Sequence, residues 1–185
     1  LRITENLVSE ATNTGVEPGT TIDLFDDFQT QNDFNGVQLG VQGQWRYCNL
    51  TLDLLMKLGL GNTRSVTTIS GMTMTETPTG EMSSSEGGLL AQSTNIGRYE
   101  NNEFAVMPEL GVKLHYDFCC RWRASIGYTF LYWSNVMRAG EQIDFGVNTS
   151  QLPPGPLMGS PQPDFRGITT DFWAQGLNFG LEYQF

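Results

Sequence analysis

Hydrophobic and polar residues alternate along five long stretches of the chain, and this alternation is the clearest signal in the sequence. In the last stretch the odd positions from Leu177 to Phe185 are all large and apolar, whereas small or polar residues lie between them. Because successive side chains of a β-strand point to opposite faces, such a stretch has one apolar face and one small or polar face. The pattern predicts a strand that runs to Phe185.

The same alternation predicts strands over residues 37–47, 50–61, 104–118 and 122–133. Cys48-Asn49 joins the first two as a two-residue hairpin turn, and Cys119-Cys120 joins the other two. We expect a bulge or an edge-like site at Pro108, because proline cannot donate a hydrogen bond to the neighbouring strand.

The remaining segments carry weaker signals. Residues 1–7 resemble the upper end of a strand, residues 66–74 a weak continuation of the preceding strand, and residues 8–19 a loop. Residues 21–30 lack a clean period of two and fit either a strand extension or a loop. Residues 76–101 and 138–168 predict two long loops, the second rich in proline.

Three features favour a membrane barrel over a soluble sandwich, whose strands also alternate. The alternating stretches run for about 11 to 15 residues, which exceeds the usual ~5 or 6 of globular sheets and is enough to cross a bilayer. Short and long connections alternate along the chain, as in outer-membrane barrels. Aromatic residues such as Trp45, Tyr47, Trp122 and Tyr183 gather at the ends of the apolar rows, where interfacial girdles form.

We therefore expect an all-β fold, an antiparallel transmembrane β-barrel with two long outer loops. Residues 1–185 would form the C-terminal part of a single barrel domain, contributing about six strands of a larger barrel. The chain opens on Leu1 without an initiator methionine, which fits this expectation of a longer parent.

The polar face of these strands supplies the candidate functional residues. If the apolar face contacts lipid, the other face borders the lumen. Mixed charges in a narrow lumen can pair and fill the interior, or they can line a pore constriction. We expect the lumen-facing residues to include Gln38, Gln42, Gln44, Asp53, Lys57, Glu109, Lys113, His115, Arg123 and Glu182.

Composition and charge exclude several alternatives. No run approaches the ~18 consecutive apolar residues that a membrane-spanning helix needs, so a helical membrane protein is excluded. The net charge of -10 argues against a nucleic-acid partner. Acidic residues such as Asp23, Asp26, Asp27, Glu76 and Glu81 fit solvated loops, and the alternative is that they bridge calcium or lipopolysaccharide. The three cysteines lack metal-site spacing, and Cys48 could be a free thiol or bridge Cys119 or Cys120.

Several segments in the C-terminal half resemble the family named Putative beta barrel porin-7. They are Gly87-Gly88-Leu89-Leu90-Ala91-Gln92, Asn95-Ile96-Gly97-Arg98-Tyr99, Phe104-Ala105-Val106-Met107-Pro108-Glu109-Leu110-Gly111, Gly127-Tyr128-Thr129-Phe130-Leu131-Tyr132-Trp133-Ser134, Gln151-Leu152-Pro153 and Asp171-Phe172-Trp173-Ala174-Gln175-Gly176-Leu177-Asn178-Phe179-Gly180. The resemblance implies a bacterial outer-membrane location, and it carries no catalytic residues.

Two functions follow as hypotheses. The first is a porin-like passive channel, and the alternative is a plugged structural or adhesive barrel that acts through its long extracellular loops. We expect no enzyme activity, because the single histidine lies beside a predicted periplasmic turn, and we expect no cofactor and no metal.

The expected partners are outer-membrane lipid and the barrel-assembly machinery. The apolar row Leu177, Phe179, Leu181, Tyr183 and Phe185 resembles the terminal signal that this machinery reads in outer-membrane barrels generally. Deletion of Phe185 is therefore expected to impair assembly.

Overall fold

The computed structural model describes residues 2–14, 20–119, 121–152 and 155–183, with the backbone alone for 2–14 and 119. The described residues form the strands β1 (Arg2–Thr14), β2 (Thr21–Tyr47), β3 (Leu50–Glu76), β4 (Met82–Glu86), β5 (Gly97–Cys119), β6 (Trp122–Val136) and β7 (Thr170–Tyr183). The 3-10 turns η1 (Ala139–Gln142) and η2 (Thr149–Gln151) are the only helical segments of this part of the chain. The expected all-β fold is confirmed.

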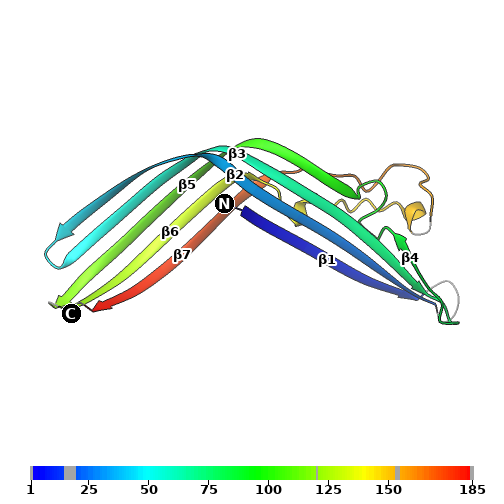
Figure 1. The fold of residues 1–185 in the computed structure, drawn as a ribbon, viewed down its shortest axis with the longest axis horizontal. Helices are drawn as coiled ribbons and strands as arrows, with labels where there is room; N and C mark the ends of the chain where they lie inside the picture. The colour runs from blue at the N-terminus through cyan, green and yellow to red at the C-terminus, as the bar shows by residue number, and fades with distance from the viewer. Residues whose placement is uncertain (1, 15–19, 120, 153–154, 184–185) are drawn as a thin grey trace. The chain divides into compact units, whose positions relative to one another are not determined.

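The strands form one sheet in the order β1-β2-β3-β5-β6-β7, and the short β4 pairs with β3 (Figure 1). The pairs β1/β2, β3/β4, β5/β6 and β6/β7 are antiparallel. Apart from β4, each strand therefore lies beside the strand that follows it in sequence, which is the hairpin order that the alternating short turns and long loops predict.

The strands extend further than the alternation indicates. Residues 21–30 belong to β2, so the strand-extension alternative is correct, and β3 continues through residues 66–74 as expected. The loop expected at residues 8–19 is wrong for residues 8–14, which pair with β2. The long loop expected at residues 76–101 also contains β4 and the first residues of β5.

The structure shows an irregularity at Pro108. The cross-strand pairs between β5 and β6 begin at Glu109. Before that point side chains of β6 replace the backbone ladder: Ser134 Oγ accepts from Val106 N at 2.9 Å, and Asn135 Nδ2 donates to Phe104 O at 2.7 Å. Of the two expectations for Pro108, a bulge or an edge-like site, the missing β6 pairing fits the edge-like site.

The two-residue turn at Cys48-Asn49 is also present, with Cys48 at a φ of 53°. Cys48 is exposed and is a free cysteine. Cys120 and the side chain of Cys119 lie outside the described residues.

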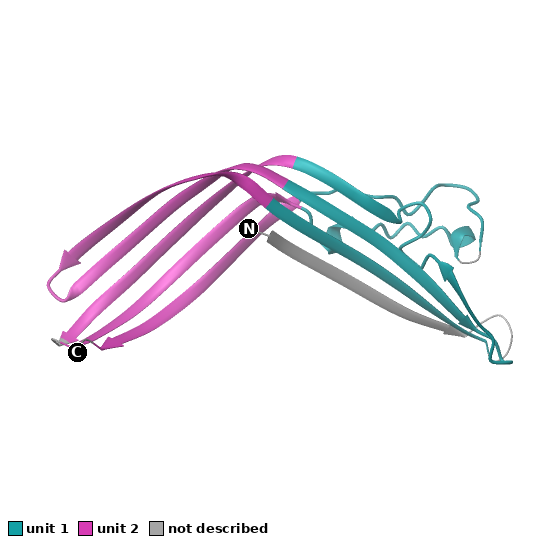
Figure 2. Ribbon diagram, in the orientation of Figure 1, with its two compact units in different colours: residues 1–33, 64–102, 137–169 teal, residues 34–63, 103–136, 170–185 magenta. Residues whose placement is uncertain are grey.

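The chain divides into two compact units, each built from pieces that are distant in sequence (Figure 2). Unit 1 comprises residues 1–33, 64–102 and 137–169, and unit 2 comprises residues 34–63, 103–136 and 170–185. Unit 1 thus contains the two long connections, whereas unit 2 contains the cleanly alternating strand segments.

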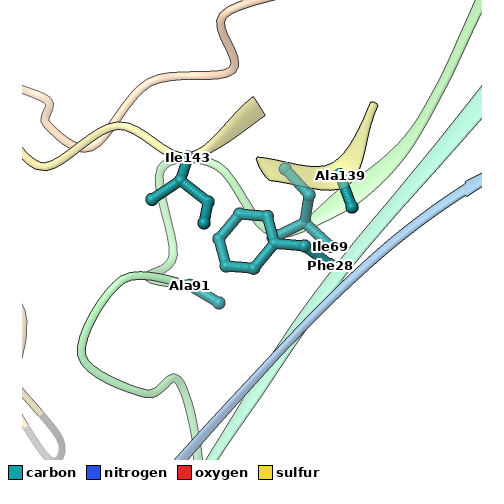
Figure 3. Packing of buried hydrophobic residues seen from close by; sticks show 5 residues of the cluster. All are labelled: Phe28, Ile69, Ala91, Ala139 and Ile143. Atoms are coloured by element: carbon teal, nitrogen blue, oxygen red, sulfur yellow. The ribbon is translucent and has the colours of Figure 1, made fainter. Parts of the chain in front are cut away.

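Unit 1 has a hydrophobic core between its strands and its loops. Phe28 of β2 and Ile69 of β3 pack with Ala91, Ala139 and Ile143 of the two connections (Figure 3). All five side chains are buried, with Phe28 and Ile69 at 1% exposure. Burial of this kind stabilises by about 25 cal/mol per Å² of apolar surface, so the long connections are folded against the strands.

Hydrogen bonds of buried polar groups hold the same connections against the strands and against each other. Asp26 Oδ1 of β2 accepts from the backbone N–H of Leu90 and Ala91 at 3.1 and 2.8 Å. Gln151 Nε2 donates to Gln92 Oε1 at 3.1 Å and to Gln162 O at 2.6 Å, which joins the two connections to each other. These hydrogen bonds satisfy polar groups that would otherwise be costly to bury.

Candidate functional site

The sheet of unit 2 has one apolar face, and its side chains are exposed. The exposed fractions reach 72% for Leu39 and 76% for Phe179. The same face carries Val37 and Val41 of β2, Leu54, Met56 and Leu58 of β3, Leu110, Val112 and Leu114 of β5, Ile126 and Tyr128 of β6, and Leu177 and Leu181 of β7. A contiguous apolar surface of this kind marks contact with a membrane or a partner.

The opposite face carries a hydrogen-bonded group from three strands. Gln44 Nε2 of β2 donates to Asp53 Oδ1 of β3 at 2.8 Å. The other carboxylate oxygen, Asp53 Oδ2, lies 3.0 Å from His115 Nε2 of β5. The structure thus brings together three of the predicted polar residues, and the Asp53 carboxylate is engaged on both oxygens.

Two further clusters on this face consist of ion pairs. Lys57 Nζ lies 3.2 Å from both carboxylate oxygens of Glu109. Arg123 Nε donates to Asp117 Oδ1 at 2.6 Å, and Arg46 lies 3.6 Å from the other oxygen of Asp117. Lys57, Glu109 and Arg123 of the predicted set therefore form ion pairs that join neighbouring strands.

The other predicted polar residues lie outside these clusters. Gln38 and Gln42 are exposed, and neither forms a side-chain hydrogen bond to another described residue. Lys113 lies next to Gly127, where an added Cβ would approach Lys113 Cγ to 3.3 Å. Glu182 is exposed and stands opposite Arg123 in the β6/β7 register.

Arg46 and Asp117 belong to the same polar rows as the predicted lumen-facing residues. Their parity in the alternation already places them on the polar face. The ion pair of Asp117 with Arg123 depends on the register between β5 and β6, in which the two residues lie opposite each other. Alternation within one strand does not give that register.

Among the residues that the structure describes, His115 forms no hydrogen bond to a serine, threonine or cysteine side chain. Ser125 lies opposite His115 in the β5/β6 register. Its hydroxyl points towards β7, because a Cβ added at Gly180 would lie 2.6 Å from Ser125 Oγ. His115 Nδ1 is buried and has no hydrogen-bond partner among the described residues. A serine hydrolase would need the serine and histidine within hydrogen-bonding reach of each other.

The described part of the chain contains no group of three or more His, Cys, Asp or Glu side chains that could hold a metal ion. No helix among the described residues is long and apolar enough to cross a membrane.

Comparison with protein families gives a match to this chain. A family model described as Putative beta barrel porin-7 (BBP7) matches residues 1–185, the whole chain. No curated protein and no solved structure matches the chain. The match thus covers more than the C-terminal segments that carry the resemblance. It also includes the residues before Leu60. The chain belongs to the Putative beta barrel porin-7 family.

Proposed function

We propose that this protein is a bacterial outer-membrane β-barrel that acts as a passive channel. The observation that carries the proposal is the two-faced sheet of unit 2, with an exposed apolar face and an ion-paired polar face on the same strands. Lipid removes the cost of exposing the apolar face, and the polar face then borders a water-filled interior. Membership of a family named for porins supports the same function.

Within this proposal the predicted polar residues line the lumen. The Lys57–Glu109 pair is the best probe, because both side chains remain partly exposed, at 33% and 22%. Removal of one partner leaves the other charge unpaired beside the conducting path. An unpaired charge attracts counter-ions and changes the selectivity of a pore.

Conductance in planar lipid bilayers tests the proposal. The purified protein should give stepwise ion currents. In a salt gradient, Lys57→Ala should shift the reversal potential towards cation selectivity and Glu109→Ala towards anion selectivity. Glu86→Ala, which removes an exposed carboxylate of unit 1, is the matched control and should shift it less. A fully inserted but silent protein would contradict the channel.

A structural or adhesive barrel is the second candidate, and the surface of unit 1 favours it. Its long connection 137–169 is packed against the strands, yet Phe145 and Met158 on it are 75% and 70% exposed. Exposed apolar side chains on a well-packed loop are suited to contact with a partner.

Surface binding tests this second candidate. Replacing Phe145 and Met158 by serine should abolish adhesion of cells that display the protein. Met82→Ser is the matched control, since Met82 is 79% exposed on β4 of the same unit. Unchanged adhesion and envelope integrity after both loops have been shortened would exclude an adhesive role.

A further inference from the structure

Unit 1 has a polar pocket on its strands that neither function explains. The pocket has a volume of about 180 Å³ and is lined by Gln29, Gln31, Asp33, Arg64, Val66, Thr68 and Arg98. Its residues come from β2, β3 and β5. The pocket therefore has room for a small polar ligand group.

Two guanidinium groups at the pocket are held by one carboxylate. Arg64 Nη2 donates to both oxygens of Glu100 at 2.8 and 2.9 Å, and Arg98 Nη2 donates to Glu100 Oε1 at 3.2 Å. The hydrogen bond from Arg64, followed by that from Arg98, holds the pKa of Glu100 below its usual range. Glu100 is therefore ionised at neutral pH and fixes the two cations side by side.

Most donors of these two arginines are still available. A guanidinium carries five N–H donors, and among the described residues each arginine engages only Nη2 in side-chain hydrogen bonds. The amide of Gln29 and the hydroxyl of Thr68 add further polar groups to the lining. Paired guanidinium groups with free N–H donors match the oxygen atoms of a phosphate group.

The pocket also contains acceptors. Asp33 lies in the lining and accepts from Gln31 Nε2 at 2.9 Å. With Glu100 it balances the two arginine charges, so a simple inorganic anion gains little net attraction. A ligand that presents a phosphate together with hydroxyl groups uses both the donors and the acceptors of this lining.

The place of Arg64 in its strand indicates where such a ligand comes from. Arg64 follows Leu60, an exposed leucine of the apolar row, by four residues of β3 and has the same parity in the alternation. Four residues of strand span at most about 13 Å of chain. Lipid headgroups begin beyond the hydrocarbon core and extend over ~5–8 Å on each side, within reach of a long arginine side chain.

We propose that this pocket binds the phosphate of a phosphorylated sugar headgroup of a membrane lipid, through Arg64 and Arg98. The inference rests on the membrane location in the proposed function, but not on the channel activity. The ligand source is the outer leaflet. The test below distinguishes this lipid from a soluble phosphate compound as the ligand.

Binding of defined lipids to the purified full-length protein in detergent tests the proposal. The probes are lipid A with both phosphates, the same lipid with its phosphates removed, and inorganic phosphate. We expect lipid A to bind at least tenfold more tightly than its dephosphorylated form. Arg64→Ala with Arg98→Ala should remove that difference. Arg121→Ala, an exposed arginine on unit 2, is the matched control and should preserve it.

Heat-modifiable migration in gels shows that each variant is folded, and bilayer conductance is recorded in parallel. Equal affinity for both lipid forms, or full discrimination in the folded double variant, would overturn the proposal. If inorganic phosphate displaced lipid A at a concentration equal to that of the lipid, the claim that the ligand is a membrane lipid would be overturned. Conductance that persists when lipid discrimination is lost separates this site from the channel.

Discussion

At the scale of single residues, Gly36 and Gly61 determine how closely β2 and β3 approach within unit 2. A Cβ added at Gly36 would lie 2.7 Å from Gly61 Cα, and one added at Gly61 would lie 2.6 Å from Gly36 Cα. Both contacts involve backbone, which cannot move aside as a side chain can. The position therefore requires glycine on both strands.

Gly36→Ala should consequently disrupt the pairing of β2 with β3. Overpacking typically costs about 1–3 kcal/mol, and a clash with backbone belongs at the upper end. Denaturant unfolding in detergent should show a lower midpoint and less heat-modifiable protein. Gly43→Ala is the control in the same strand, because an added Cβ there meets nothing within 4 Å. Equal midpoints for the two variants would contradict this account.

Asp144 makes the long connection 137–169 sensitive to acid. Asp144 Oδ2 accepts from the backbone N–H of Asp164 at 3.0 Å, and Oδ1 accepts from that of Gly146 at 2.9 Å. These two hydrogen bonds hold the pKa of Asp144 below its ordinary value. A carboxyl group whose folded-state pKa is lowered stabilises the fold above its unfolded pKa of about 3.9.

The stabilising effect of Asp144 should therefore be complete above about pH 4 and disappear as the pH falls through the lower pKa of the folded state. Pepsin digestion between pH 2 and 5 measures the protection of this connection. The unmodified protein should be better protected than Asp144→Asn near pH 5, and the two should converge at lower pH. A constant difference between them across this range would exclude titration of Asp144 as the cause.

At the scale of elements, the alternation was most informative in unit 2 and least in unit 1. Residues 21–30 form a strand without a clean apolar row because some of their buried positions are polar. Asp26 and Thr30 are buried at 2% and 0%, and Asp26 binds the backbone of a loop. Where a strand binds a loop through hydrogen bonds, polar residues replace apolar ones at its buried positions. The strand then lacks the hydrophobic pattern from which it could be predicted.

Asn32 is the clearest such residue, and it holds the start of the connection 137–169. Its Nδ2 donates to Met137 O at 2.8 Å, and its Oδ1 accepts from Met137 N at 2.9 Å and from Ser65 Oγ at 2.7 Å. Asn32 is fully buried. An amide that bonds both backbone groups of one residue acts as a clip between strand and loop.

Asn32→Ala should release this connection from the strands. Each buried polar group left without a partner costs about 1–3 kcal/mol, and two of the groups belong to the Met137 backbone. Proteolysis within residues 137–169 should accelerate strongly. Asn32→Asp keeps the acceptor but places a buried carboxylate oxygen against Met137 O, so it should also accelerate cleavage. A cleavage rate for Asn32→Ala equal to that of the unmodified protein would contradict the clip.

At the scale of the whole molecule, the sequence predicts which residues share a face but not which residues touch. Alternation places Gln44, Asp53 and His115 on the polar rows of three strands. The face of each residue follows from the alternation within its own strand alone. Their contact also requires the registers of β2 with β3 and of β3 with β5, which depend on pairing between distant segments. The pocket at Arg64 and Arg98 escaped prediction for the same reason.

The assignment of the two faces can be tested on neighbouring residues of β7. Leu177 is 64% exposed on the apolar face, and Asn178 follows it on the polar face. If the apolar face contacts lipid, Leu177→Arg places a charge in the hydrocarbon, which costs about 2–4 kcal/mol near the midplane of the bilayer. Asn178→Arg places the same charge in the water-filled interior, where its solvation is retained.

Refolding into lipid vesicles, followed by urea unfolding, measures both variants under one condition. Leu177→Arg should lower the free energy of unfolding by about 2–4 kcal/mol or prevent insertion, and Asn178→Arg should change it much less. Equal losses would mean that both faces meet the same environment, which contradicts a lipid-facing wall. The reverse order would place lipid on the polar face, which the paired charges of Lys57 with Glu109 and of Arg123 with Asp117 argue against.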